Sequence, residues 1–183
     1  EGLNGNAQIN ASGQGLQGLP TDHLLRSQVD GSIFELGPYG GQNALMLGNG
    51  YPASGTLTLT TPQPFNRLTI LATSANGGGV GTLVLNFTNG TKSQVFNLNA
   101  QDWYNTTANV AVQGFGRVRL GQATFSTENP GWNNPNIYQT TIDLAALGIN
   151  QTVASLSITN PAIGGSRTTA ILGVSGMVMP ASV

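Results

Sequence analysis

The sequence predicts an all-β domain built as an antiparallel β-sandwich, and three observations lead to this prediction. Short stretches along the chain place an apolar residue at every second position, the period of a strand with one buried face. Turn-forming residues, above all the 26 glycines, separate these stretches at short intervals. No longer stretch carries the 3.6-residue period of an amphipathic helix.

The N-terminal part of the chain contains the first expected strands. Residues 1–32 are rich in Gly, Asn and Gln without a sustained period, so we expect an irregular lead-in that can add an edge strand. Regular alternation starts after Ser32, and clusters of Gly, Pro and Asn end each run. The first four strands are expected at Ile33–Leu36, Ala44–Leu47, Thr56–Thr60 and Phe65–Thr73.

A β-hairpin is the strongest local prediction. Asn89-Gly90 separates Thr82–Thr88 from Ser93–Leu98, and both turn residues tolerate positive φ. The alternation in the first arm turns its leucines and Phe87 toward the core. A loop of two residues and a loop of three both fit, and they pair different partners, so the register stays open.

Four more strands are expected in the C-terminal half, and each has one apolar face. Tyr138 and Ile142 share such a face, and so do Ala154, Leu156 and Ile158. Without an internal repeat or a linker, residues 1–183 are expected to form one domain with one core. The four strands are expected at Arg117–Phe125, Tyr138–Leu144, Val153–Ile158 and Thr168–Val178.

The amino-acid composition limits which binding partners and which cellular location we expect for the protein. Only 7% of the residues are charged, and the six basic residues are scattered, so a nucleic-acid partner is not expected. No stretch approaches the ~20 apolar residues of a membrane span. A weakly charged β-protein with many glycines and uncharged polar residues fits a secreted, extracellular or cell-surface location, and the absence of cysteine does not argue against export. The start at Glu1 fits either a removed signal peptide or a piece of a larger parent polypeptide.

No catalytic residue is predicted. His23 is the only histidine, and Asp22 beside it would point the other way on an extended chain, so a Ser-His-Asp triad is not expected. The stretch Gly173–Met177 departs from the G-x-S-x-G motif at its last position. An unusual glycosidase or lyase remains an alternative, because paired carboxylates need only face each other across a cleft.

No cofactor is expected, with structural calcium as the one open possibility. Secreted sandwiches often hold a loop together with oxygen ligands. Asp22 and Asp30 flank an irregular segment, and Glu35 follows it. No carboxylate lies beyond Asp143 to close such a site from the C-terminal strands.

Aromatic and amide side chains cluster in two loop-like segments, residues 97–106 and 128–138. A sugar offers an apolar face to an aromatic ring and hydroxyls to amides, so this mixture favours carbohydrate binding. The alternative for Trp103 is that it folds back over the end of the core. The residues predicted to contact a sugar are Trp132, Trp103, Tyr104, Asn105, Asn133, Asn134 and Tyr138.

An ordered series of motifs resembles a known family. The series runs Leu68-Thr-Ile-Leu-Ala-Thr-Ser-Ala-Asn-Gly77, Val84-Leu-Asn-Phe-Thr-Asn-Gly-Thr-Lys92, Val95-Phe96 and Asp102-Trp103. It resembles galactose-binding-like jelly-roll domains of exported bacterial proteins, some sorted by a PEP-CTERM signal and others appended to enzymes that act on polysaccharides. The resemblance implies a jelly-roll sandwich and supplies no catalytic motif.

These observations together predict a non-catalytic carbohydrate-binding module of a secreted or cell-surface bacterial protein. Its expected partner is a polysaccharide or another glycan. The alternative is a structural or adhesive extracellular domain without a small ligand, which low charge and Asn- and Thr-rich strands also fit.

Overall fold

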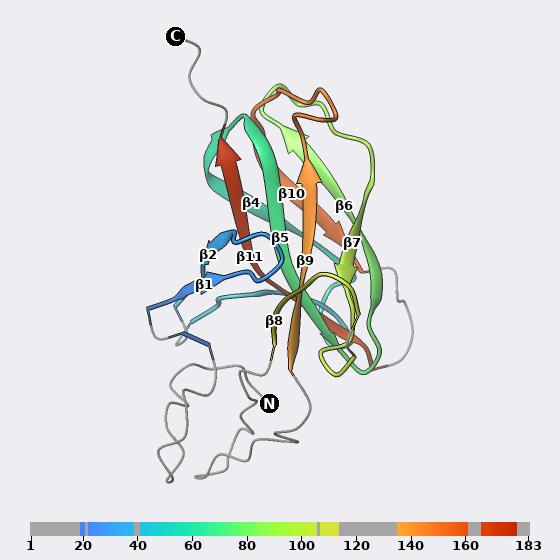
Figure 1. Ribbon diagram of the computed structural model, residues 1–183. Helices are drawn as coiled ribbons and strands as arrows, with labels where there is room; N and C mark the ends of the chain where they lie inside the picture. Colours follow the sequence, from blue (N-terminus) through green and yellow to red (C-terminus); the bar gives the residue numbers. More distant parts are fainter. Residues whose placement is uncertain are drawn as a thin grey trace.

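The computed structural model describes residues 19–20, 22–38, 41–105, 107–113, 135–160 and 166–178 (Figure 1). Within these ranges the chain forms eleven β-strands and no helix. Every pairing between these strands is antiparallel. The predicted all-β sandwich is therefore confirmed, while the jelly-roll connectivity stays a prediction.

The strands form two layers and a small hairpin. The four-stranded sheet runs β4 (Ser54–Gln63), β10 (Val153–Thr159), β6 (Gly79–Phe87) and β7 (Phe96–Ala100). The five-stranded sheet runs β3 (Leu45–Gly48), β11 (Thr168–Val178), β5 (Phe65–Ala75), β9 (Asn136–Asp143) and β8 (Val110–Gln113). The hairpin consists of β1 (Leu24–Arg26) and β2 (Ile33–Glu35).

The main core lies between the two large sheets. The predicted inward residues of β5 and β6 are all buried there, and on β6 buried residues alternate with more open ones as predicted. On β10, a register shift between Val153 and Ser155 buries Val153 as well as Leu156. The inward residues of β5 and β6 are Leu68, Ile70, Ala72, Leu83, Leu85 and Phe87.

A second apolar cluster lies on the outer face of the five-stranded sheet. There Leu25 and Phe34 of the β1–β2 hairpin pack against Leu71 of β5, Ala111 of β8 and Ile137 of β9. Figure 1 shows the hairpin lying across β11 and β5. Because both faces of β5 are covered, its residues are buried on both sides and not in alternation. The irregular lead-in thus contributes β1, a strand that covers a sheet face.

The predicted hairpin between β6 and β7 is confirmed, and its loop has three residues. The Phe87 N–H donates to the Thr91 carbonyl, and the Gly90 N–H donates to the Phe87 carbonyl. Only Gly90 has positive φ, at 83°. Asn89 contributes through its side chain instead, since its Oδ1 accepts a hydrogen bond from the Thr91 N–H at 3.0 Å.

The return arm of this hairpin begins later than predicted because of a bulge. Asn86 bridges to Lys92, whereas Leu83 pairs with Phe96, so the return arm holds one extra residue. The Ser93 hydroxyl accepts a hydrogen bond from the Leu85 N–H at 2.9 Å within the bulge. The regular strand therefore starts at Phe96.

In the middle of the chain, one predicted strand is not tested and one observed strand was not predicted. The strand predicted at Arg117–Phe125 lies outside the described residues. Strand β8 was not predicted, because Val110–Gln113 is too short for its alternation to stand out. Its position matters for the site, since it pairs only with the first residues of β9.

Candidate functional site

The loop after β7 is held to the end of β5 by backbone contacts. Trp103 donates its N–H to the Ser74 carbonyl at 2.7 Å. One carboxylate oxygen of Asp102 accepts a hydrogen bond from the Gly77 N–H at 2.5 Å, and the other accepts one from the Tyr104 N–H at 3.0 Å. Asp102 therefore joins its own turn to the glycine-rich turn between β5 and β6.

Gly78 explains why this turn is rich in glycine. A Cβ atom at this position would lie 1.8 Å from the backbone nitrogen of Asp102 and 2.1 Å from the carbonyl carbon of Gln101. Only a glycine lets the two backbones approach this closely. The glycine turn and Asp102-Trp103, which are separate motifs in the sequence, thus form one structural contact.

Tyr138 contacts the same loop from the protein interior. Its side chain is fully buried, and its hydroxyl group faces the carbonyl oxygens of Asp102 (3.0 Å) and Asn105. The buried Asn136 beside it donates its side-chain amide to the Asn105 carbonyl at 2.6 Å. Tyr138 was predicted to contact a sugar, but its ring cannot form part of a surface, because it lies in the interior.

Of the other residues predicted to contact a sugar, the structure brings Trp103, Tyr104 and Asn105 together in one loop. Trp103 is half-buried, and its ring meets that of Tyr104 edge-on, with ring centroids 5.4 Å apart and planes at 89°. Tyr104 is the more open of the two, with 41% of its surface exposed, and Asn105 next to it is exposed. The remaining three predicted residues, Trp132, Asn133 and Asn134, lie outside the described residues.

An open groove lies beside this loop, at the edge of the sandwich where β7 faces β9. Its volume is about 470 Å³. Strand β7 contributes Asn97 and Asn99, and the following loop contributes Gln101, Thr107 and Asn109. Strand β9 contributes Gln139, Thr140 and Thr141, and Val80 of β6 and Ala108 complete the lining.

The groove exists because two sheet edges remain open at this side. The Asn99 N–H points away from β6 and donates to the Thr140 hydroxyl at 2.8 Å, which ties the edge of one sheet to the other. Strand β8 covers β9 only as far as Tyr138, so the following residues of β9 reach the groove. The Asn99 side-chain amide donates to the Ala108 carbonyl at 3.3 Å and holds the loop in place.

Among the described residues, the groove is lined mostly by polar side chains and by no ionisable one. Amides and hydroxyls both donate and accept hydrogen bonds, which suits a ligand made of hydroxyl groups. The sequence analysis singled out the segment that contains Asn97 and Asn99, but it missed the contribution of β9. The alternation of exposed asparagines on β7 was the available signal, whereas Thr140 reaches the groove only through tertiary packing.

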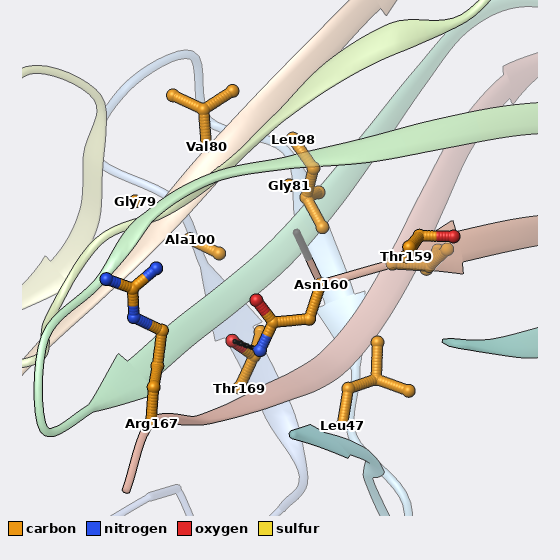
Figure 2. A pocket seen from close by; sticks show the side chains of 11 residues that line it. Leu47, Gly79, Val80, Gly81, Leu98, Ala100, Thr159, Asn160, Arg167 and Thr169 are labelled. Carbon is orange, nitrogen blue, oxygen red and sulfur yellow. Dashed lines mark hydrogen bonds between the residues drawn. The ribbon is translucent and has the colours of Figure 1, made fainter. Parts of the chain in front are cut away.

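A second cavity, near the glycine turn, is too small for a sugar (Figure 2). Its volume is about 10 Å³, which is room for about one water molecule. Arg167, Asn160 and Thr169 line one side, and the Asn160 amide donates to the Thr169 hydroxyl at 3.1 Å. The Arg167 guanidinium lies against the turn, 3.3 Å from the Cβ position of a side chain at Gly79.

The acidic side chains mostly stabilise their own turns. Asp22 accepts a hydrogen bond from the Leu24 N–H at 3.0 Å, Asp30 from the Ser32 N–H at 3.0 Å, and Asp143 from the Ala146 N–H at 2.8 Å. Among the described residues, no three acidic or histidine side chains come together in an arrangement that could hold a metal ion. Asp22, Asp30 and Glu35, considered as calcium ligands, are thus not gathered into one site.

His23 takes a structural position in the turn before β1. Its φ is 62°, and its ring Nδ1 lies 3.2 Å from the Gly37 carbonyl oxygen. Its own carbonyl accepts a hydrogen bond from the Leu36 N–H at 2.8 Å. These contacts join the start of the β1–β2 hairpin to its end.

Among the described residues, Tyr138 and Asp30 have shifted pKa values. Burial raises the pKa of Tyr138, and the nearby Asp102 charge adds to the shift, against hydrogen bonds that oppose it. Burial alone would raise the pKa of Asp30, but hydrogen bonds from Ser32 and the nearby Arg67 charge outweigh it. The pKa of Asp30 is therefore lowered.

Comparison with known proteins adds no relative. No protein-family model matches the chain. No curated protein matches its sequence.

In the part of the chain that the structure describes, no helix has the length and apolar character needed to cross a membrane.

Proposed function

We propose that the protein is a non-catalytic carbohydrate-binding module of a secreted or cell-surface bacterial protein, and that the groove between β7 and β9 binds the sugar. The observation that carries this proposal is the groove itself, about 470 Å³ in volume, whose described lining consists mostly of amides and threonine hydroxyls and includes no ionisable group. Such a lining matches the hydroxyls of a sugar, whereas an anionic or cationic ligand would need a countercharge.

The loop that carries Tyr104 adds an aromatic ring near the groove. Gln101 and Thr107 on either side of this loop line the groove, and the Tyr104 ring is exposed beside the half-buried Trp103. An exposed ring of this kind offers a flat apolar surface to the C–H face of a sugar. The resemblance to galactose-binding-like domains supports the same function.

The proposal is tested by titrating the protein with neutral oligosaccharides, followed by calorimetry and tryptophan fluorescence. An open groove implies weak binding, with Kd of about 10⁻³ to 10⁻⁵ M. Asn97→Ala should weaken binding about tenfold without changing the thermal midpoint, because Asn97 is exposed and lines the groove. Asn150→Ala, at an exposed asparagine that is not among the residues lining the groove, is the matched control and should bind like the unmodified protein.

Tyr104→Ala gives a second measurement at the loop. It should also weaken binding, and it should leave stability nearly unchanged because the ring is exposed. Binding that both variants leave unchanged would argue against the groove as the site.

A second candidate function is a structural or adhesive extracellular domain without a small ligand. The observation that favours it is the use of Asp102 and Tyr138 in holding the loop, since both are occupied by contacts within the chain. The absence of binding to a broad range of glycans at millimolar concentration would favour this alternative.

A further inference from the structure

We propose that the outer face of the four-stranded sheet continues the groove and binds an extended, uncharged polysaccharide chain across its strands. This inference rests on the proposed function of the groove and names the kind of ligand. It concerns a surface that the sequence analysis did not single out.

A row of hydrogen-bonding side chains crosses the whole sheet and ends at the groove. Strand pairing places Ser54 of β4 beside Thr159 of β10, Thr159 beside Thr82 of β6, and Thr82 beside Asn97 of β7. Paired residues of neighbouring strands project from the same face. Asn97 also lines the groove, so the row and the groove form one continuous surface.

A second row runs parallel to the first. Thr58 of β4 pairs with Ser155 of β10, which pairs with Asn86 of β6. The Asn86 amide donates to the hydroxyls of Ser155 at 3.0 Å and of Ser157 at 2.9 Å, which holds both hydroxyl oxygens beside this amide. The face thus presents ordered hydroxyls at the spacing of the strands.

The strands of the four-stranded sheet carry no charged residue. None of the described strands β4, β6, β7 and β10 contains Asp, Glu, Lys or Arg, whereas Arg67 and Asp143 lie on the other sheet. Lys92 lies outside these strands, exposed at the end of the second row, where it bridges to Asn86. Removing a charge from water is expensive unless a partner charge is supplied, so a charged face opposes a neutral polymer. Hydroxyls and amides exchange water for sugar hydroxyls at little cost.

The face is open and long enough for several sugar units. Thr56, Thr58 and Asn97 are exposed, in contrast to the covered outer face of the other sheet. Crossing from β7 to β4 spans three strand spacings, about 14 Å. A second copy of the chain is a poor occupant, because the centre of a stable protein interface is mainly apolar, whereas the apolar Val80 and Val84 of β6 alternate with Thr82 and Asn86 on this face.

The test compares short and long neutral oligosaccharides of the same sugar, from two to six units, with an acidic polymer such as polygalacturonate. Calorimetry should show affinity rising about tenfold from the shortest to the longest neutral ligand, with no preference for the acidic polymer. Thr58→Lys places a charge on the far side of the sheet from the groove, and it should abolish this gain with length while leaving binding of the disaccharide unchanged. Asn150→Lys is the control for the added charge and should keep the gain.

The outcomes separate this inference from the proposed function. If no neutral saccharide of any length binds, both are overturned. If short and long ligands bind equally well, or if Thr58→Lys retains the gain with length, the groove remains the site and the sheet face does not contribute. Preference for the acidic polymer, or a dimer in sedimentation experiments that Thr58→Lys dissociates, would also overturn the inference.

Discussion

The outer faces of the two sheets differ in whether they are covered by other parts of the chain. Both sheets bury one face against the other sheet, but the five-stranded sheet also covers its outer face with the β1–β2 hairpin, while the four-stranded sheet leaves its outer face to water. The covered face is apolar, with Leu71, Ala111 and Ile137 beneath Phe34. The open face is built mostly from Ser, Thr and Asn, with Val80 and Val84 of β6 among them.

This difference separates the stabilising face from the face that is available for binding. An apolar face must be covered, because apolar burial is the main favourable contribution to folding. A polar, uncharged face gains little from being covered, so it remains free to contact a ligand. Stability should therefore depend strongly on side chains of the covered face and weakly on side chains of the open face.

The largest effect should come from truncating the hairpin residue that covers the five-stranded sheet. Phe34 is fully buried, and its ring lies 3.6 Å from the Cβ position of a side chain at Gly173. Phe34→Ala should lower the free energy of unfolding by about 3–5 kcal/mol, as measured by urea denaturation. Thr56→Ala on the open face is the control and should change it by about 0.5 kcal/mol or less. Equal effects of the two variants would contradict the comparison.

A smaller effect should come from the turn that joins β6 to β7 in the open sheet. Gly90 has φ of 83° and no atom within 4 Å of a Cβ at this position, so a substitution meets only backbone strain. Gly90→Val should cost about 1–2 kcal/mol in urea denaturation. Asn89→Gly should cost less, since Asn89 contributes a side-chain hydrogen bond and not a positive φ. A cost for Gly90→Val below that of Asn89→Gly would contradict this account of the turn.

Removing the hydrogen-bonded amide of the open face should have a still smaller effect. Asn86→Ala loses the hydrogen bonds to Ser155 and Ser157, and we expect a loss of about 0.5–1.5 kcal/mol in the free energy of unfolding. The half-exposed site limits the loss, because water can replace the amide. A loss as large as that of Phe34→Ala would show that the open face is needed for stability, and this would contradict the comparison.

The smallest effect should be the acid sensitivity of the covered face. The pKa of Asp30 is lowered in the folded state, so its stabilising contribution is present above the unfolded pKa of about 4 and is lost as the pH falls through the folded value. Arg67 lies 3.9 Å away near the surface, and we expect a loss below about 1 kcal/mol. Urea denaturation between pH 7 and pH 3 should show this loss in the unmodified protein and a smaller one in Asp30→Asn. Identical pH profiles of the two proteins would show that Asp30 does not contribute to the loss of stability at low pH.

The sequence was sufficient to predict the fold class and most strands because strand alternation is a local property. The inward residues of β5 and β6 could be read directly, and so could the hairpin at Asn89-Gly90. The register of that hairpin could not be predicted, because it depends on the bulge where Ser93 bonds to Leu85. The short strand β8 was missed for lack of length.

The candidate site was predicted only in part. The loop around Trp103, Tyr104 and Asn105 was identified, and the structure places it beside the groove. Tyr138 was also chosen, because an aromatic residue among asparagines looks the same in sequence whether it faces water or the core. Its burial depends on the loop that folds over it, which brings the Asn105 carbonyl to its hydroxyl group.

The sequence by itself determined the all-β class, the alternation of buried and exposed residues, and the lack of charge on the four sheet strands, since each of these depends on neighbouring residues alone. Only the tertiary structure decided which face would be covered and where β7 would meet β9. Residues far apart in sequence, such as Asn99 and Thr140, come together there because two sheets pack with their edges offset. A groove at a sheet edge is a property of that packing, and local residue patterns do not encode it.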